Sequence, residues 1–378
     1  MKRILIAQLG VYGDCLHATT IARQIKQNNP QCELTWAIGS AYADILVGNP
    51  DVDQVWTYPI KNRWEVTSKW FKFLEEVKLV SSKYDEIYFT QTYPGNPDRF
   101  YDCAREAMFS AYPEPITVPL EPVLRLSPIE VERVRAFANT HGLPRFTDNK
   151  TDFEYYEVIL FECTPQSNQS FLTLDMAADL ATDIVKRFPR TCVIVVGSKT
   201  ALENFPFRKN VIDGSVLSFR EMAELTNYCT LFIGTGSGIT QICQSDWADP
   251  LPTIQLLTQG TVASLISDHN YFHLDTDAII ELVDVNEMDI VNCIDNIFEN
   301  GFSAAKEVPR VQIVPDFTMI RFHMMFESAR LQGNLFAIFP ALIKTIRDYG
   351  MTTGLINFFL SFPKSIMKLA IYRWHGVK

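Results

Sequence analysis

The feature that most constrains the fold is a pair of short glycine-bearing loops, each placed directly after an apolar run and directly before a helical pattern. The first loop follows Ile4-Leu5-Ile6 and contains Gly10 and Gly13 ahead of Asp14. The second loop reads Gly234-Thr235-Gly236-Ser237-Gly238. A strand, a small-residue loop and a helix repeated in both halves predict two α/β domains that face one another across a cleft.

The first domain is expected to span residues 1–150. Its β-type runs fall at 3–9, 32–38, 53–58 and 84–90, and its helical patterns at about 17–29, 40–48, 64–82 and 98–111. This alternation predicts a parallel sheet covered on both faces, as in a Rossmann-like domain. After a further helical pattern at 128–141, the polar segment Gly142 to Asp152 is interpreted as a linker.

The second domain is expected to span residues 151–317, where the same alternation restarts. Its apolar runs are Glu157 to Phe161, Thr191 to Gly197, Leu231 to Gly234 and Thr253 to Leu257. Its helical patterns fall at about 173–188, 218–228 and 286–300. The fold class predicted for the whole chain is therefore α/β, with two Rossmann-like domains and a C-terminal helical extension.

Composition limits the partners and the compartment. The 378 residues, 47% of them apolar, are enough for two cores. The net charge of −10 opposes a polyanion, so no nucleic acid is expected to bind. Eight cysteines without a C-x-x-C pair indicate reduced thiols, and the first apolar run is too short for a signal peptide. These patterns predict a cytoplasmic protein.

The extension, residues 318–378, differs in charge from the rest. It holds eight Lys or Arg and two acidic residues, a charge of +6, whereas residues 1–317 carry −16. Interleaved aromatic residues such as Phe358, Phe359 and Trp374 predict basic amphipathic helices lying on the anionic inner-membrane surface, so that the protein is peripheral there. The alternative is a helical pair packed across both domains. No apolar stretch reaches the roughly 18–20 residues of a spanning helix.

The second glycine loop is a candidate diphosphate site, because backbone N–H groups and the positive end of a helix dipole favour an anion. A polar loop after the first strand of the same domain would meet it at the carboxyl edge of the sheet. The predicted donor-binding residues are Thr164, Gln166, Ser167, Asn168, Ser170, Gly197, Gly234, Thr235, Gly236, Ser237, Gly238 and Gln241. The alternatives are a tight connection at Gly236 and a solvated loop with Ser170 or Thr173 as helix cap.

Asp14 is the candidate catalytic base, because a carboxylate at the mouth of the first domain can accept a proton from an attacking hydroxyl. It could instead cap the following helix. Gly10, Gly13 and His17 are assigned to the acceptor side, although a histidine on a helix face is often merely packed. No metal is expected, because His269 and His273 lack a third ligand at metal spacing.

These residues together resemble the ADP-heptose:lipopolysaccharide heptosyltransferase family, glycosyltransferase family 9, over about residues 1–300. The similarity lies in Ile4 to Asp14, in Asn49-Pro50-Asp51-Val52-Asp53-Gln54-Val55, and in Ser218 to Gln244. The resemblance implies a GT-B fold, an acceptor domain followed by a donor domain, Asp14 as base, and inverting transfer from a nucleotide-diphosphate sugar. It also implies no cofactor beyond that donor substrate.

The chain departs from the family pattern where the donor would bind. The family has an acidic residue followed by S-G-P-x-H, whereas this chain has Gly236-Ser237-Gly238-Ile239-Thr240-Gln241. The family lysine early in the second domain is replaced by Asn168-Gln169-Ser170. ADP-heptose is therefore disfavoured as donor, and Lys199 or Arg208 is a candidate for the missing cation.

The function predicted from the sequence is transfer of a sugar from a nucleotide-activated donor to a glycan or lipid-linked acceptor in bacterial surface polysaccharide or lipopolysaccharide synthesis. One alternative is an inactive GT-B scaffold in a glycan assembly complex, because the family lysine and histidine are missing. Another is a nucleotide-sugar epimerase or an NAD-linked enzyme, and the incomplete G-x-G-x-x-G disfavours dinucleotide binding.

Overall fold

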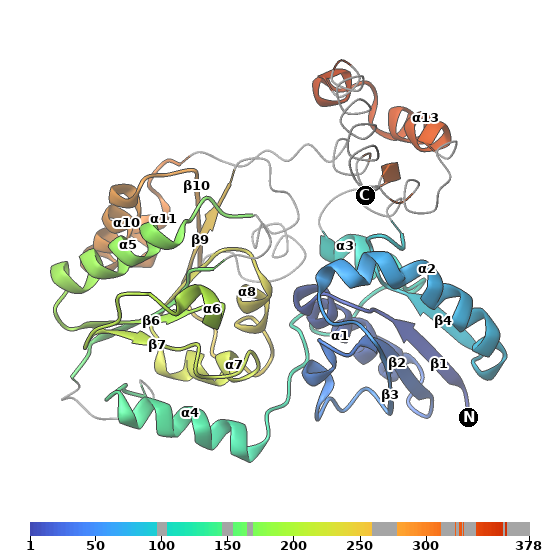
Figure 1. Ribbon diagram of the computed structural model, residues 1–378, viewed down its shortest axis with the longest axis horizontal. Coiled ribbons are helices and arrows are strands. Elements are labelled where there is room, and N and C mark those ends of the chain that lie inside the picture. The colour runs from blue at the N-terminus through green and yellow to red at the C-terminus, as the bar shows by residue number, and fades with distance from the viewer. Residues whose placement is uncertain are drawn as a thin grey trace, which may run out of the picture.

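The computed structural model describes residues 1–96, 104–145, 154–164, 169–258 and 278–310. In the extension it describes residues 322, 325–326, 328, 338–357 and 360. Figure 1 shows two lobes, each built on one sheet, with α1 of the first lobe facing α8 of the second.

The first lobe contains a four-stranded parallel sheet in the order β3-β2-β1-β4. Its strands are β1 (Arg3–Ala7), β2 (Glu33–Gly39), β3 (Gln54–Tyr58) and β4 (Glu86–Phe89). The last four residues of β1 are fully buried, as expected for a central strand covered on both faces. The predicted parallel sheet is confirmed.

The helices and 3-10 turns that follow these strands are α1 (Tyr12–Asn28), η1 (Ala43–Leu46), α2 (Arg63–Val80), η2 (Ser81–Lys83) and α3 (Ala104–Phe109). The predicted helix at 40–48 is only the turn η1. Pro50 disfavours helical backbone at the residue before it, which limits the length available there.

The second lobe contains a six-stranded parallel sheet in the order β10-β9-β8-β5-β6-β7. Its strands are β5 (Glu157–Glu162), β6 (Thr191–Val196), β7 (Val211–Asp213), β8 (Leu231–Gly234), β9 (Thr253–Leu257) and β10 (Ile279–Val283). Strands β7 and β10 were not expected from the sequence. Three residues are too few to show the period of two on which a strand prediction depends.

The helices of this lobe are α4 (Pro128–Thr140), α5 (Leu174–Arg187), α6 (Lys199–Leu202), α7 (Glu221–Leu225), η4 (Thr226–Tyr228), α8 (Gly238–Ile242), α10 (Glu287–Asn300) and α11 (Phe302–Lys306). Helix α4 precedes the predicted boundary near residue 150, yet it contacts α7 of the second lobe. The boundary itself lies in 146–153, outside the described residues.

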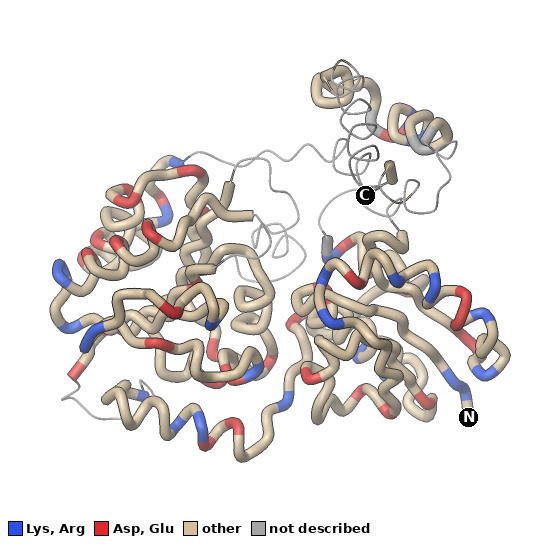
Figure 2. The backbone as a smooth tube through the Cα atoms, in the orientation of Figure 1, with Lys and Arg blue, Asp and Glu red and all other residues tan. Residues whose placement is uncertain are grey.

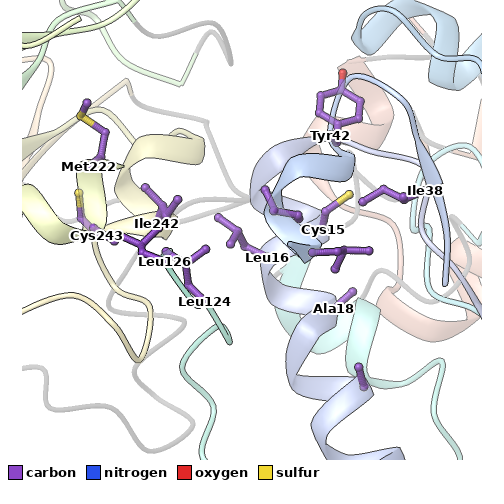
Figure 3. Close-up of a cluster of buried hydrophobic side chains, with 14 of the residues drawn as sticks. Cys15, Leu16, Ala18, Ile38, Tyr42, Leu124, Leu126, Met222, Ile242 and Cys243 are labelled. Carbon is purple, nitrogen blue, oxygen red and sulfur yellow. The ribbon is translucent and has the colours of Figure 1, made fainter. Parts of the chain in front are cut away.

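One apolar cluster runs from the first lobe into the second. Figure 3 shows Leu16 of α1 on the side that faces Leu124, Leu126 and Ile242. All four side chains are buried. The two lobes therefore share packed hydrophobic surface in addition to the chain that links them.

The extension includes α13 (Ile338–Tyr349), which lies beyond the first lobe in Figure 1. The Ser328 hydroxyl donates to the carbonyl of Pro94 at 3.1 Å, which ties the extension to that lobe. Phe339 and Ile343, one turn apart on α13, are 64% and 66% exposed. In the described part of the chain, every helix is too short or too polar to cross a bilayer.

Charged residues of both signs are mixed along the two lobes, as Figure 2 shows. Helix α13 carries Lys344 and Arg347, close in sequence to its exposed Ile343. Most of the basic residues predicted to contact a membrane lie outside the described residues.

Candidate active site

A cavity of about 740 Å³ lies between the two lobes. It is lined from both sides by Val11, Tyr12, Gly13, Ala41, Tyr42, Lys61, Asn62, Arg63, Trp64, Glu162, Thr164, Gly197, Ser198, Phe219, Ser237, Gly238 and Ile239. Most of these residues follow the carboxyl ends of β1, β2, β5, β6 and β8, where open α/β sheets bind their ligands. The two predicted glycine loops therefore meet at one cavity.

The two glycine loops touch one another. A Cβ on Gly13 would lie 3.4 Å from Gln241 Cγ, and a Cβ on Gly238 would lie 3.1 Å from Tyr12 Cβ. The Tyr12 ring stacks on Phe219 with centroids 4.2 Å apart. The first distance is an ordinary van der Waals contact, so of these two glycines it is Gly238 whose missing side chain eases the close approach of the lobes.

Asp14 lies in the first turn of α1, directly after the cavity-lining Gly13. Burial raises the pKa of its carboxyl group from 3.8 to about 7, and a hydrogen bond from the Val11 backbone N–H opposes this rise. Asp14 thus bonds to the N-cap residue of α1 and keeps a pKa near the working range of a general base. The capping role and the predicted catalytic role are compatible.

The other two residues assigned to the acceptor side lie away from the cavity wall. Gly10 is covered by Tyr42, whose ring would be 2.5 Å from a Cβ at that position. His17 is buried and accepts a hydrogen bond at Nδ1 from Arg105 Nε at 3.2 Å.

The second-lobe loop is organised by Glu162, the last residue of β5. Its carboxylate accepts hydrogen bonds from the Thr235 backbone N–H at 3.0 Å, from the Thr240 hydroxyl at 3.0 Å and from the Ser237 hydroxyl. Ser237 also caps α8 by accepting from the Ile239 N–H. Glu162 was not selected from the sequence, although an acidic residue that ends an apolar strand is a signal for this edge of the sheet.

The remaining predicted donor residues differ in position. Thr164 and Gly197 line the cavity, and the Ser198 N–H donates to Thr164 Oγ1 at 2.7 Å. Gly234 and Gly236 are buried and do not line the cavity, and Gly236 has a φ of +72° that favours glycine. Residues 165–168, which include Gln166, Ser167 and Asn168, lie outside the described residues.

Two further predicted donor residues have structural contacts. The Ser170 hydroxyl accepts from the Leu172 N–H at 3.2 Å, and Thr173 is the N-cap of α5. Gln241 is buried against Gly13. The alternative interpretation of the loop that ends at Thr173, in which Thr173 caps the following helix, is therefore confirmed.

The cations that line the cavity come from the first lobe, and the sequence did not single them out. Lys61 and Arg63 flank Asn62, the N-cap of α2, and the Arg63 guanidinium lies 4.3 Å from the Trp64 ring centroid. Arg208 instead donates to Thr182 on the outer helix α5. Lys199 follows Ser198 at the start of α6 without lining the cavity.

Metal ligation has no candidate in the part of the chain that the structure describes. Within those residues, three or more His, Cys, Asp or Glu side chains do not gather in a metal-binding arrangement. His269 and His273 fall in 259–277, outside that part.

Solved structures that share this fold include two glycosyltransferases. A family 9 glycosyltransferase from Veillonella parvula aligns with a TM-score of 0.54 and 13% identity, over 91% of this chain and 98% of that chain. The chain has the GT-B fold. The ADP-heptose lps heptosyltransferase II of E. coli has the same fold, with a TM-score of 0.52, 13% identity and coverage of 79% of this chain and 98% of that chain.

The GT-B fold is thus confirmed, and so is the resemblance to family 9 glycosyltransferases as one of fold. No protein-family model matches the sequence, and no curated protein matches it. At this level of identity the shared fold leaves the substrates to be argued from the cavity.

Proposed function

We propose that the protein is a glycosyltransferase that moves a sugar from a nucleotide-activated donor to a glycan or glycolipid acceptor. The observation that carries the proposal is the cavity between the lobes of a GT-B fold, with Asp14 next in the chain to Gly13 of the cavity wall. The first lobe would hold the acceptor and the second lobe the donor.

Asp14 would act as the general base. As the acceptor oxygen attacks the anomeric carbon, the bond from that carbon to the diphosphate oxygen breaks, and the hydroxyl proton passes to the Asp14 carboxylate. A single displacement of this kind inverts the anomeric configuration. A pKa of about 7 suits the step, because the carboxylate can both lose and accept the proton near neutral pH.

The leaving diphosphate needs positive charge or hydrogen-bond donors. Lys61 and Arg63 supply two cations at the cavity wall. They support the proposal because the lysine that the family has early in the second domain is replaced by Asn168-Gln169-Ser170 in this chain. No metal or other cofactor is part of the proposed step.

The acceptor class and location remain part of the same proposal. A lipid-linked acceptor in surface polysaccharide synthesis, and contact of residues 318–378 with the inner face of the cytoplasmic membrane, are supported by the charge of +6 in that segment. The exposed Phe339 and Ile343 on α13 add apolar surface suited to a bilayer interface.

The experiment is a nucleotide-sugar panel assayed for release of nucleoside diphosphate, with and without glycan acceptors. We expect release with one nucleotide class, and loss of at least about a hundredfold in rate for Asp14→Asn. Asp179→Asn, an exposed aspartate on α5, is the matched control. An Asp14→Asn enzyme with the wild-type rate would exclude Asp14 as base.

One observation favours a second candidate, an inactive GT-B scaffold. Three hydrogen-bond donors of the second-lobe loop are already taken by Glu162. A scaffold would release no nucleoside diphosphate from any donor in the same assay, with or without acceptor.

A further inference from the structure

Glu162 holds a position in the loop that a substrate anion would otherwise take. Its Oε2 accepts from the Thr235 N–H and the Thr240 hydroxyl, and its Oε1 accepts from the Ser237 hydroxyl. Backbone N–H and hydroxyl donors converging at the start of a helix are the groups that bind phosphate elsewhere. Here an internal carboxylate satisfies them.

The charge of Glu162 has no partner of opposite sign close by. In the described residues, no lysine or arginine forms an ion pair with it, and the cavity's cations, Lys61 and Arg63, belong to the other lobe. The ionisable groups close to it are the thiols of Cys163 and Cys243. Burial raises the pKa of Glu162, and the hydrogen bonds from Ser237 and Thr235 oppose that rise.

Glu162 also lies at the cavity wall, although the residue is almost fully buried. Its carboxylate oxygens are held by the donors of the loop, so it acts on a ligand in the cavity as a fixed negative charge. A negative charge repels an ionised phosphate, whereas a sugar hydroxyl carries no charge to be repelled.

We propose that Glu162 is a specificity-determining residue that directs a neutral, hydroxyl-bearing part of the substrate to the loop Thr235–Thr240 and keeps the diphosphate away from it. The proposal rests on the proposed function, because it assumes that a nucleotide-activated sugar enters this cavity. The diphosphate would then lie nearer the wall formed by Lys61 and Arg63.

The test compares Glu162→Gln with Glu157→Gln by calorimetric titration of ADP, GDP, UDP and CDP and of the matching uncharged nucleosides. Glu157 is the matched control, because it begins the same strand and accepts a hydrogen bond from the Thr230 hydroxyl at 2.6 Å, away from the cavity. We expect Glu162→Gln to bind the preferred nucleoside diphosphate about tenfold more tightly, because one repulsive charge is removed.

The nucleoside should bind both variants with nearly wild-type affinity, and Glu157→Gln should leave diphosphate affinity unchanged. An unchanged or weaker affinity of Glu162→Gln for the nucleoside diphosphate would overturn the inference while leaving the glycosyltransferase proposal intact. If no nucleoside diphosphate binds either the wild type or Glu162→Gln, the proposed function fails and this inference fails with it.

A second measurement uses the wild-type protein and does not depend on the folding of a variant. In a crystal structure with the tightest-binding nucleoside diphosphate, we expect Glu162 to keep its bonds to Thr235, Ser237 and Thr240. A phosphate oxygen bound to the Thr235 N–H, with Glu162 turned away, would refute the assignment.

Discussion

Replacing Asp14 by Asn should stabilise the protein at neutral and basic pH while it removes the proposed catalytic base. The folded protein holds the Asp14 proton up to a pKa of about 7, whereas the unfolded chain releases it near 3.8. Between these values the folded state binds more protons, so its unfolding free energy falls as the pH rises. Above about pH 7 the loss is complete and constant.

The structure sets an upper limit for this effect. The pKa difference is about three units, and each unit corresponds to about 1.4 kcal/mol, so ionisation of Asp14 costs the fold up to about 4 kcal/mol. An asparagine carries no charge to desolvate, and its amide oxygen can still accept the hydrogen bond from Val11. Asp14→Asn should therefore gain up to that amount at pH 8 and almost nothing near pH 4.

Denaturant titrations followed by tryptophan fluorescence, at pH 4 to 8, measure this difference. Four of the six tryptophans lie in the first 150 residues, so the signal is weighted toward the lobe that holds Asp14. Asp179→Asn on the exposed face of α5 is the control and should change neither stability nor rate. A stability difference for Asp14→Asn that stays flat from pH 4 to 8 would refute the reasoning.

Three other predictions concern the contacts between the lobes. Arg220→Ala should lower the unfolding free energy measured in denaturant titrations by about 3–5 kcal/mol, because the buried guanidinium donates to Glu130 and to the carbonyls of Asp44 and Val47. A change below about 1 kcal/mol would contradict this expectation. Burial raises the pKa of Glu130, but hydrogen bonds from Arg220 and Ser127 lower it further, so that this pKa is about 2, below its usual 4.5. The stability advantage of wild type over Glu130→Gln should be full above pH 4.5 and disappear as the pH falls toward 2, and an advantage that persists unchanged at pH 2 would count against it. Gly238→Val should reduce sugar transfer and increase the separation of the lobes measured by solution scattering, because a Cβ at this position would lie 3.1 Å from Tyr12 Cβ of the first lobe. Full activity of this variant would show that the contact is dispensable.

Much of the architecture follows from local patterns in the sequence. The strands β1, β5, β6 and β8 are apolar runs that are buried on both faces, which makes them visible without any tertiary information. The meeting of the two glycine loops also follows, because both lie after the carboxyl ends of parallel strands.

The sequence could not predict which groups accept the hydrogen bonds that these side chains and backbone N–H groups donate. Thr235 and Ser237 were expected to donate to a diphosphate, yet the structure gives their donors to Glu162, 73 and 75 residues away. The cations at the cavity, Lys61 and Arg63, come from a segment with no local motif. The first pairing depends on the adjacency of β5 and β8 in the second sheet, and the second depends on the relative placement of the two lobes.

Two consecutive residues of the segment between α3 and α4 form hydrogen bonds with different lobes. The Val123 N–H donates to the Thr19 hydroxyl of α1 at 2.7 Å, and the Leu124 N–H donates to the Asp246 carboxylate at 2.9 Å. The Pro122 carbonyl also accepts from the Asp246 N–H at 2.9 Å, and α4 packs on the second lobe, so the chain passes from the first lobe to the second around residues 122–124. An independently expressed first lobe should accordingly stop at Val123, because a fragment reaching residue 150 would retain a helix that has lost its packing partner.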